Sequence, residues 1–212
     1  MKDYEGEIMG KRNEMELALG SSKIYDKIME ENLQERKIII NNNIDENILE
    51  DVILQILKFN REDKGKEVES RKPIMLYMNS LGGDVTIGSV LCDVIKSSKT
   101  PIYGVTIGYS YSMGALIFIC THKRYMFPNS SMLIHDGNTA LSGSANKVKD
   151  LQKFYNKMDD RIKELVIECS KITDEEYEEN IDRELYMYAD ECKEKGLCDF
   201  IIGQDCSIEE IL

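Results

Sequence analysis

Tryptophan is absent from this 212-residue chain, and histidine is scarce, with only two copies. A mechanism that needs a histidine base therefore has just two candidates, His122 and His135. No stretch approaches the roughly 18 apolar residues of a membrane span, and the N-terminal residues lack the apolar core of a secretory signal. We therefore expect a cytoplasmic protein that makes no membrane contact.

The six cysteines lack the spacing of a metal site or a redox pair, because none falls in a Cys-x-x-Cys motif. Without a secretory signal, such cysteines are expected to be reduced and buried as small apolar side chains. The glycine-containing stretch Gly82–Gly88 matches neither the dinucleotide fingerprint nor a Walker loop. Neither a metal ion nor an organic cofactor is expected.

Positive charge is also in short supply, since 27 Lys and Arg face 39 Asp and Glu, for a net charge of −12. Nucleic-acid binding is not expected, because phosphate contacts need a basic surface. A hydrophobic content of 42% and a length of 212 residues are typical of one soluble globular domain. The segment 1–35, rich in Glu, Lys and Met, is interpreted as a peripheral arm, and 36–212 as a single domain.

Short β-branched segments alternate with amphipathic ones along this domain, which predicts an α/β fold with largely parallel strands. Strands are expected at 37–40, 73–78, 102–107, 124–127 and 132–134. Helices are expected at 45–58, 85–96, from 112 onward, at 142–170, 174–180 and 188–196.

Ser112 stands between the apolar strand 102–107 and the apolar run 113–120. A serine at such a turn meets unpaired backbone N–H groups that favour developing negative charge, which is where a nucleophilic serine has to lie. The alternative is a simple helix N-cap. The sequence Gly108-Tyr-Ser-Tyr-Ser-Met-Gly114 contains the two halves of a Gly-x-Ser-x-Gly motif without the complete motif.

Three further features are compatible with catalysis or with structure alone. Gly82-Gly83 follows a strand, either as a tight turn or as an oxyanion-binding backbone. His135 ends the strand 132–134 and is either a base or a structural side chain, whereas His122 lies in a polar turn and favours a solvated role. Within Asp182-Arg183-Glu184, an acid either orients a histidine or closes a helix with an ion pair.

Five short motifs occur in one order: Asn79-Ser-Leu-Gly-Gly83, Tyr111-Ser-Met-Gly-Ala115, Pro128-Asn-Ser130, Ile134-His135 and Gly196-Leu-Cys-Asp199. This set resembles the proteolytic subunit of the ATP-dependent Clp protease, and the similarity runs from about residue 35 to 202. The resemblance implies the spiral of β-α-β units shared by Clp peptidases and crotonases, with residues 142–170 as a protruding handle helix.

The resemblance also implies a serine endopeptidase that hydrolyses unfolded polypeptides. Ser112 would be the nucleophile, His135 the base and Glu184 the acid, with the backbone N–H groups of Gly83 and Met113 as the oxyanion hole. Similar proteins form two stacked heptameric rings of identical subunits, and an AAA+ unfoldase feeds them. Neither a metal nor a cofactor takes part.

This chain departs from the family pattern at Glu184, where an aspartate is usual, and Asp182 is the rival acid. The segment before about residue 24 and the insertion at 61–72 also differ from the family. Two alternatives follow: an inactive ring subunit in which Glu184 does not orient His135, or an acyl-CoA enzyme of the crotonase type, which would need neither Ser112 nor His135.

Overall fold

The computed structural model describes residues 24–137 and 139–212, and the chain divides into two compact units, 1–37 and 38–212. In the first unit, residues 24–34 form a helix on which Ile24, Tyr25 and Ile28 are exposed. The expected arm 1–35 thus lies largely outside the described residues, because 1–23 are not among them. Its role stays a prediction.

The second unit contains nearly all of a seven-stranded sheet and the helices around it. Its strands are β1 (Lys37–Ile40), β2 (Ile74–Ser80), β3 (Ile102–Tyr111), β4 (Lys123–Met126), β5 (Ser131–Ile134), β6 (Leu185–Tyr188) and β7 (Phe200–Ile201). Its α-helices are α2 (Leu54–Glu62), α3 (Val85–Ser97), α4 (Met113–Ile119), α5 (Ala145–Glu168), α6 (Asp174–Asn180) and α7 (Ala189–Glu194). Shorter helical turns are η1 (Leu49–Ile53), η2 (Val68–Ser70) and η3 (Ile208–Ile211).

The sheet runs in the order β1-β2-β3-β4-β7, and β3 is its centre. β3 pairs in parallel with β2 on one side. On its other side it pairs in parallel with two strands, β4 and β5. Its first half, Tyr103–Thr106, pairs with β4, and its last residues, Tyr109–Tyr111, pair with β5. β6 joins the outer edge of β5 antiparallel. The α/β architecture with a mostly parallel sheet is confirmed.

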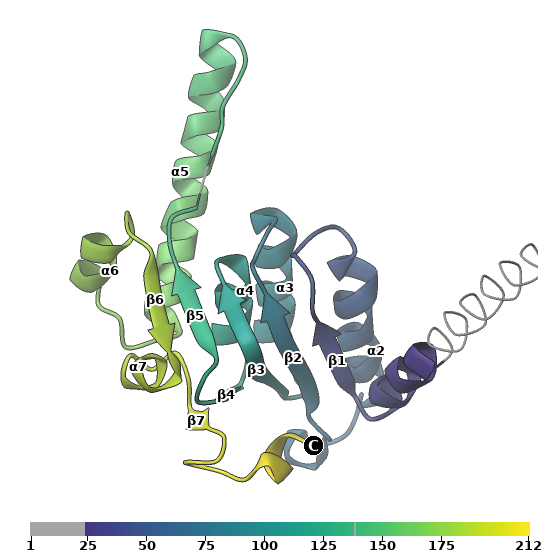
Figure 1. Ribbon diagram of the computed structural model, residues 1–212. Coiled ribbons are helices and arrows are strands. Elements are labelled where there is room, and N and C mark those ends of the chain that lie inside the picture. The colour runs from purple at the N-terminus through teal and green to yellow at the C-terminus, as the bar shows by residue number, and fades with distance from the viewer. Residues whose placement is uncertain (1–23, 138) are drawn as a thin grey trace, which may run out of the picture. The chain divides into compact units, whose positions relative to one another are not determined.

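One face of the sheet is covered by α2, α3 and α4, which follow β1, β2 and β3 along the chain (Figure 1). Every residue of α4 is buried, as expected for a helix that is apolar on all sides. On β2, Ile74, Leu76 and Met78 are fully buried, and the alternate residues point to the other face because side chains alternate along a strand.

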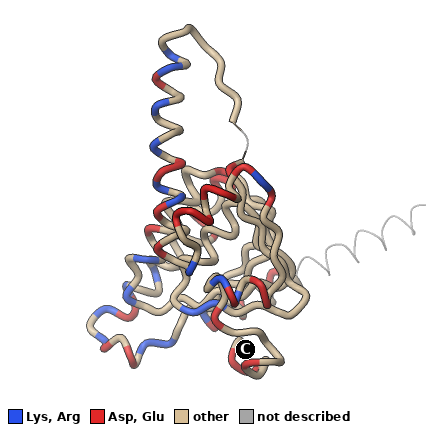
Figure 2. Tube along the Cα trace, turned by 90° about the vertical axis from the view of Figure 1, so that its left-hand side faces the viewer, with Lys and Arg blue, Asp and Glu red and all other residues tan. Residues whose placement is uncertain are grey.

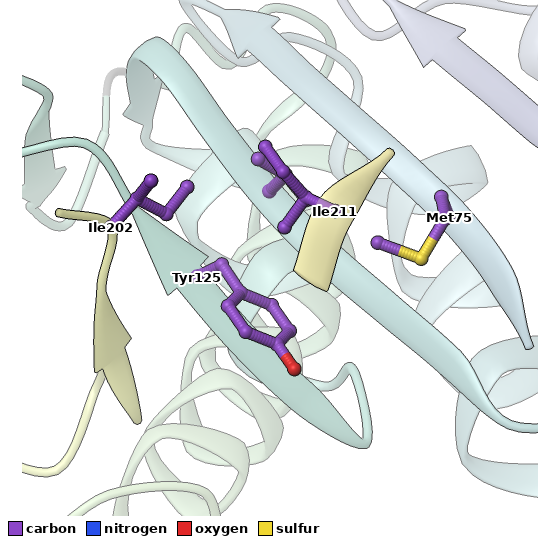
Figure 3. Close-up of a cluster of buried hydrophobic side chains, with 5 residues drawn as sticks. Met75, Tyr125, Ile202 and Ile211 are labelled. Atoms are coloured by element: carbon purple, nitrogen blue, oxygen red, sulfur yellow. The ribbon is translucent and has the colours of Figure 1, made fainter. Parts of the chain in front are cut away.

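The second face of the sheet is covered by the C-terminal segment (Figure 3). Met75, Val105, Tyr125, Ile202 and Ile211 form a buried apolar cluster there, and the carbonyl oxygen of Ile211 accepts a hydrogen bond from the hydroxyl of Tyr77. Burial raises the pKa of Tyr125 to about 12. The C-terminal turn η3 is therefore part of the core.

A 24-residue helix, α5, extends beyond the edge of the sheet, and only Val166 on it is buried (Figure 1). Lys and Arg alternate with Asp and Glu along its length (Figure 2). The bounds agree closely with the expected 142–170, but its use as a handle between rings stays a proposal. Within residues 24–137 and 139–212, no helix combines the length and apolar character that a membrane span requires.

Local differences from the expected elements have clear physical causes. β3 continues to Tyr111, four residues past the predicted end, because pairing with β2 and β5 supports a stretch whose Gly108 and serines suggest a turn. The expected helix 45–58 starts as a π-helical turn, η1, before α2. β6 and β7 were not predicted, because each is short and gains stability from a neighbouring strand.

All six cysteines are free thiols, four of them buried.

Candidate active site

Ser112 lies at the sharp turn between β3 and α4, in a backbone conformation that residues with a side chain rarely adopt. Its φ is 53° and its ψ is −124°, and Arg36 is the only other non-glycine residue with a positive φ in the described ranges. Such a conformation costs about 1–3 kcal/mol and persists only where the surroundings impose it. It is the geometry of a nucleophile elbow, which presents the serine hydroxyl away from the backbone.

Backbone hydrogen bonds on both sides hold this turn. The Ser112 N–H donates to the carbonyl of Leu133 on β5 at 2.9 Å. The Ser112 carbonyl accepts from the N–H groups of Ala115 at 2.9 Å and Leu116 at 3.2 Å, which starts α4. The strained residue is therefore fixed between the sheet and a fully buried helix.

The glycine turn after β2 packs directly against the elbow. A Cβ atom on Gly82 would lie 2.7 Å from both the Ser112 Cβ and the Tyr111 carbonyl oxygen, and 3.0 Å from the Met113 nitrogen. A Cβ atom on Gly83 would lie 2.2 Å from the carbonyl oxygen of Ile44. Both glycines have positive φ, at 96° and 148°. Only glycine permits this close approach of two backbones.

The two predicted oxyanion donors are the backbone N–H groups of Gly83 and Met113. Met113 is the first residue of α4, so its N–H has no intrahelical acceptor. The turn that contains Gly83 is anchored by hydrogen bonds between its neighbours and Ile44, at 2.8 Å from Ile44 N–H to the Gly82 carbonyl and at 2.7 Å from Asp84 N–H to the Ile44 carbonyl. Neither the Gly83 nor the Met113 N–H donates to an acceptor within the described part of the chain.

His135 follows β5 directly, and pairing of Tyr111 with Leu133 places the end of β5 beside the elbow. The side chain of His135 is largely buried, and its Nδ1 lies 3.5 Å from Oε1 of Glu184, which is 58% exposed. The Glu184 carboxylate lies near the hydroxyl of Tyr186 and, as its main cause, raises the pKa of Tyr186. The structure thus brings Glu184 to the nitrogen of His135 that faces away from a substrate in a serine hydrolase.

The rival acid, Asp182, has a different neighbour. Its Oδ1 lies 3.9 Å from Nε of Arg183, and both side chains are strongly exposed. His122 also has a local role, because its Nδ1 accepts a hydrogen bond from the Ile102 N–H at 3.0 Å. Of the two acids and two histidines considered, the structure brings together Glu184 and His135.

Ser112 and His135 line one cavity of about 250 Å³. Among the described residues, no hydrogen bond joins the Ser112 hydroxyl to His135. Catalytic hydrogen bonds are often long before substrate binds, so this geometry is compatible with a nucleophile and its base. Within the same part of the chain, no group of three His, Cys, Asp or Glu side chains is arranged to hold a metal ion.

The family model for the Clp protease matches residues 20–205. The chain belongs to the Clp protease family. Membership in this family makes it a peptidase in general terms, and it agrees with the mostly parallel sheet and with the motifs around Ser112 and His135.

Sequence reasoning missed other residues that surround the site of this Clp protease family member. Asp159 and Asp160 on α5 line the cavity together with Tyr177 on α6. The sequence held one signal, because Asp159 lies three residues before Ile162 and so interrupts the apolar face of the helix. Only the packing of α5 against α4 and α6 shows that this interruption faces the cavity.

Proposed function

We propose that this chain is a serine endopeptidase of the Clp type that hydrolyses unfolded polypeptides. The observation that carries the proposal is the strained Ser112 at an elbow that shares a cavity with His135, whose Nδ1 lies 3.5 Å from Glu184. A strained non-glycine backbone lowers the stability of the folded protein. Such strain is expected where a nucleophilic side chain has to point away from the backbone toward a substrate.

The reaction is acyl transfer in two steps. Ser112 Oγ attacks the peptide carbonyl carbon while His135 Nε2 takes the hydroxyl proton. The intermediate collapses to an ester on Ser112, and His135 returns the proton to the leaving amine. Water then attacks the ester with His135 again as base, which releases the carboxylic acid and restores the serine hydroxyl.

Two groups of side-chain and backbone atoms support these steps. The N–H groups of Gly83 and Met113 hydrogen-bond the oxyanion, and each such donor is worth on the order of 10²–10³ in rate in hydrolases. The carboxylate of Glu184 holds His135 in the tautomer with its proton on Nδ1 and stabilises the imidazolium that forms. No metal or cofactor supplies a step in this scheme.

The proposed assembly is a chamber of two stacked heptameric rings of this chain, supplied by an AAA+ unfoldase in the cytoplasm. Self-association is general in the Clp protease family. On α5, Leu151 and Phe154 are exposed at 40% and 59%, so the helix has apolar surface available to another subunit as a handle would. The segment 1–35 would be a peripheral arm.

The test is covalent labelling with a fluorophosphonate, read by intact mass and peptide mapping. We expect one adduct per chain on Ser112, its loss in Ser112→Ala, and a fall in peptide cleavage of about 10⁴-fold or more in that variant. Ser110→Ala is the matched control, because Ser110 lies two residues away on β3 with a buried hydroxyl bonded to Thr106 at 2.8 Å. It should label normally.

Unchanged cleavage in Ser112→Ala would overturn the assignment of the nucleophile. An assembled wild-type ring that takes no adduct and cleaves nothing would instead support the inactive ring subunit. A size-exclusion measurement on the same sample shows whether the ring is present. Thioester hydrolysis that persists in Ser112→Ala would favour the acyl-CoA enzyme.

A further inference from the structure

The cavity beside Ser112 has an unusual charge for a site that accepts an uncharged peptide. Carboxylates from three elements line it: Asp136 in the loop after β5, Asp159 and Asp160 on α5, and Glu178 on α6. Figure 2 shows acidic residues on several segments where α5 approaches the sheet. The question is which of these charges remain available to a substrate.

Among the described residues, Lys163 is the only Lys or Arg side chain that lines the cavity, and it already has two partners. Its Nζ lies 2.5 Å from Glu178 and 2.9 Å from Asp174. These two carboxylates more than offset its charge. Lys163 is therefore not available as an ion-pair partner for Asp136, Asp159 or Asp160.

Asp136, Asp159 and Asp160 have no ion-pair partner among the residues described. Partial burial, followed by the charges of Asp136 and Asp160, raises the pKa of Asp159 above its ordinary range. Burial is the main cause that raises the pKa of Tyr177 at the cavity wall, and the charges of Asp159, Glu178 and Asp136 raise it further. Asp136 and Asp159 thus approach one another from different elements, and a cation between them would relieve their repulsion.

Apart from Ser112, His135 and Tyr177, the rest of the cavity wall is largely apolar. Ile134 ends β5 and is buried, Met113 and Leu116 lie on the buried α4, and Ile162 and Ile181 close the sides. A cavity lined by apolar side chains and by several carboxylates fits a side chain with an aliphatic stem and a cationic head. The volume of about 250 Å³ suits one side chain rather than a whole ligand.

We propose that this cavity is a specificity subsite that selects lysine or arginine at the residue whose carbonyl Ser112 attacks, with Asp159 and Asp136 as the residues that read the positive charge. The inference rests on the proposed peptidase function. The attacked carbonyl bonds to Ser112 Oγ, so the side chain two bonds away enters the cavity that Ser112 lines. The stem packs on Met113 and Leu116, and the head reaches the carboxylates.

The experiment uses the assembled protein and three fluorogenic peptides that differ only in the residue before the cleaved bond: Lys, norleucine or Glu. Norleucine matches the stem of lysine without its charge, so the ratio of kcat/KM for Lys over norleucine isolates the charge. We expect a ratio of about tenfold or more in favour of Lys, with Glu cleaved slowest. The ratio should fall as ionic strength rises.

Asp159→Asn should lower this ratio at least threefold, and Asp159→Lys should invert the preference so that the Glu peptide becomes the better substrate. Asp150→Asn is the matched control, since it makes the same change on α5 outside the cavity and should preserve both the ratio and the absolute rates. Peptidyl phosphonates that carry Lys or norleucine give the same comparison from labelling rates when turnover is slow.

Equal rates for Lys and norleucine in the natural chain, or a ratio that Asp159→Asn does not change, would overturn the subsite while the peptidase function stands. Failure of the proposed function looks different. In that case no peptide is cleaved, and neither the phosphonates nor the simple fluorophosphonate modifies Ser112.

Discussion

The nucleophile side of the candidate site, at the junction of β3 and α4, is held by buried neighbours, whereas the acid side, in the turn between α6 and β6, is open to solvent. Ser112 is fixed by three backbone hydrogen bonds and by the close approach of Gly82. Glu184 is 58% exposed and stands 3.5 Å from His135, beyond ordinary hydrogen-bond length. The strained turn at Ser112 is thus rigid, whereas the exposed turn that carries Glu184 beside His135 can change its conformation.

This difference explains why the exposed acid position tolerates a longer side chain, whereas the buried turn at Ser112 does not tolerate added atoms. A glutamate in place of the family's usual aspartate has one more methylene, and an exposed turn can accommodate it by a small shift. The elbow has no such freedom, because a single added carbon at Gly82 meets atoms at 2.7 Å. Substitutions on the two sides should therefore differ in both stability and rate.

The largest effect is expected for Gly82→Ala. The new Cβ clashes with Ser112 and Tyr111 and also forces alanine into a φ of 96°, so we expect a loss of about 2–4 kcal/mol in unfolding free energy. Displacement of Ser112 should lower kcat for peptide cleavage by about 10². Urea unfolding and steady-state kinetics measure the two effects.

Gly203→Ala is the control for backbone strain alone, because its φ is 83° and no atom lies within 4 Å of an added Cβ. It should lose about 1 kcal/mol and keep its activity. If Gly82→Ala behaved like Gly203→Ala in both measurements, the elbow would not be the rigid half of the site.

An intermediate effect is expected for Glu184→Gln, which keeps the shape of the side chain but removes its charge. We expect kcat to fall about 10- to 100-fold with little change in KM, because the carboxylate acts on the imidazolium in the transition state. Asp182→Asn, two residues away and paired with Arg183, should change kcat less than twofold. A loss below tenfold in both variants would indicate a Ser-His dyad or a third member elsewhere.

The smallest effect is expected for Tyr186→Phe. This variant keeps the ring, which packs edge-on against Tyr111 with centroids 5.5 Å apart, and removes the hydroxyl that interacts with Glu184. We expect a two- to fivefold fall in kcat, and no further fall when the change is made in Glu184→Gln. Tyr188→Phe, equally exposed on the same strand, is the control. Additive losses in the double variant would show that Tyr186 does not act through Glu184.

Much of the fold could be predicted from the sequence, because the parallel strands and amphipathic helices have distinct periodicities. The site could be predicted only in part. The turn at Ser112 has a local signature between two apolar segments, but the contact of Glu184 with His135 depends on the course of the chain after α6, which no local pattern describes. The acidic wall of the cavity likewise depends on where α5 lies, since Asp159 alone resembles any solvated helix residue.

The three residue pairs that join the end of β3 to β5 have a consequence for how this chain can vary over evolutionary time. Side chains alternate along a strand, so inserting or deleting one residue in β5 would send His135 to the opposite side of the sheet from the serine it serves. A change of length in an exposed loop outside the sheet would not reverse the direction of a strand side chain in this way. Length changes in this short segment are expected to be lethal to activity even when the protein still folds.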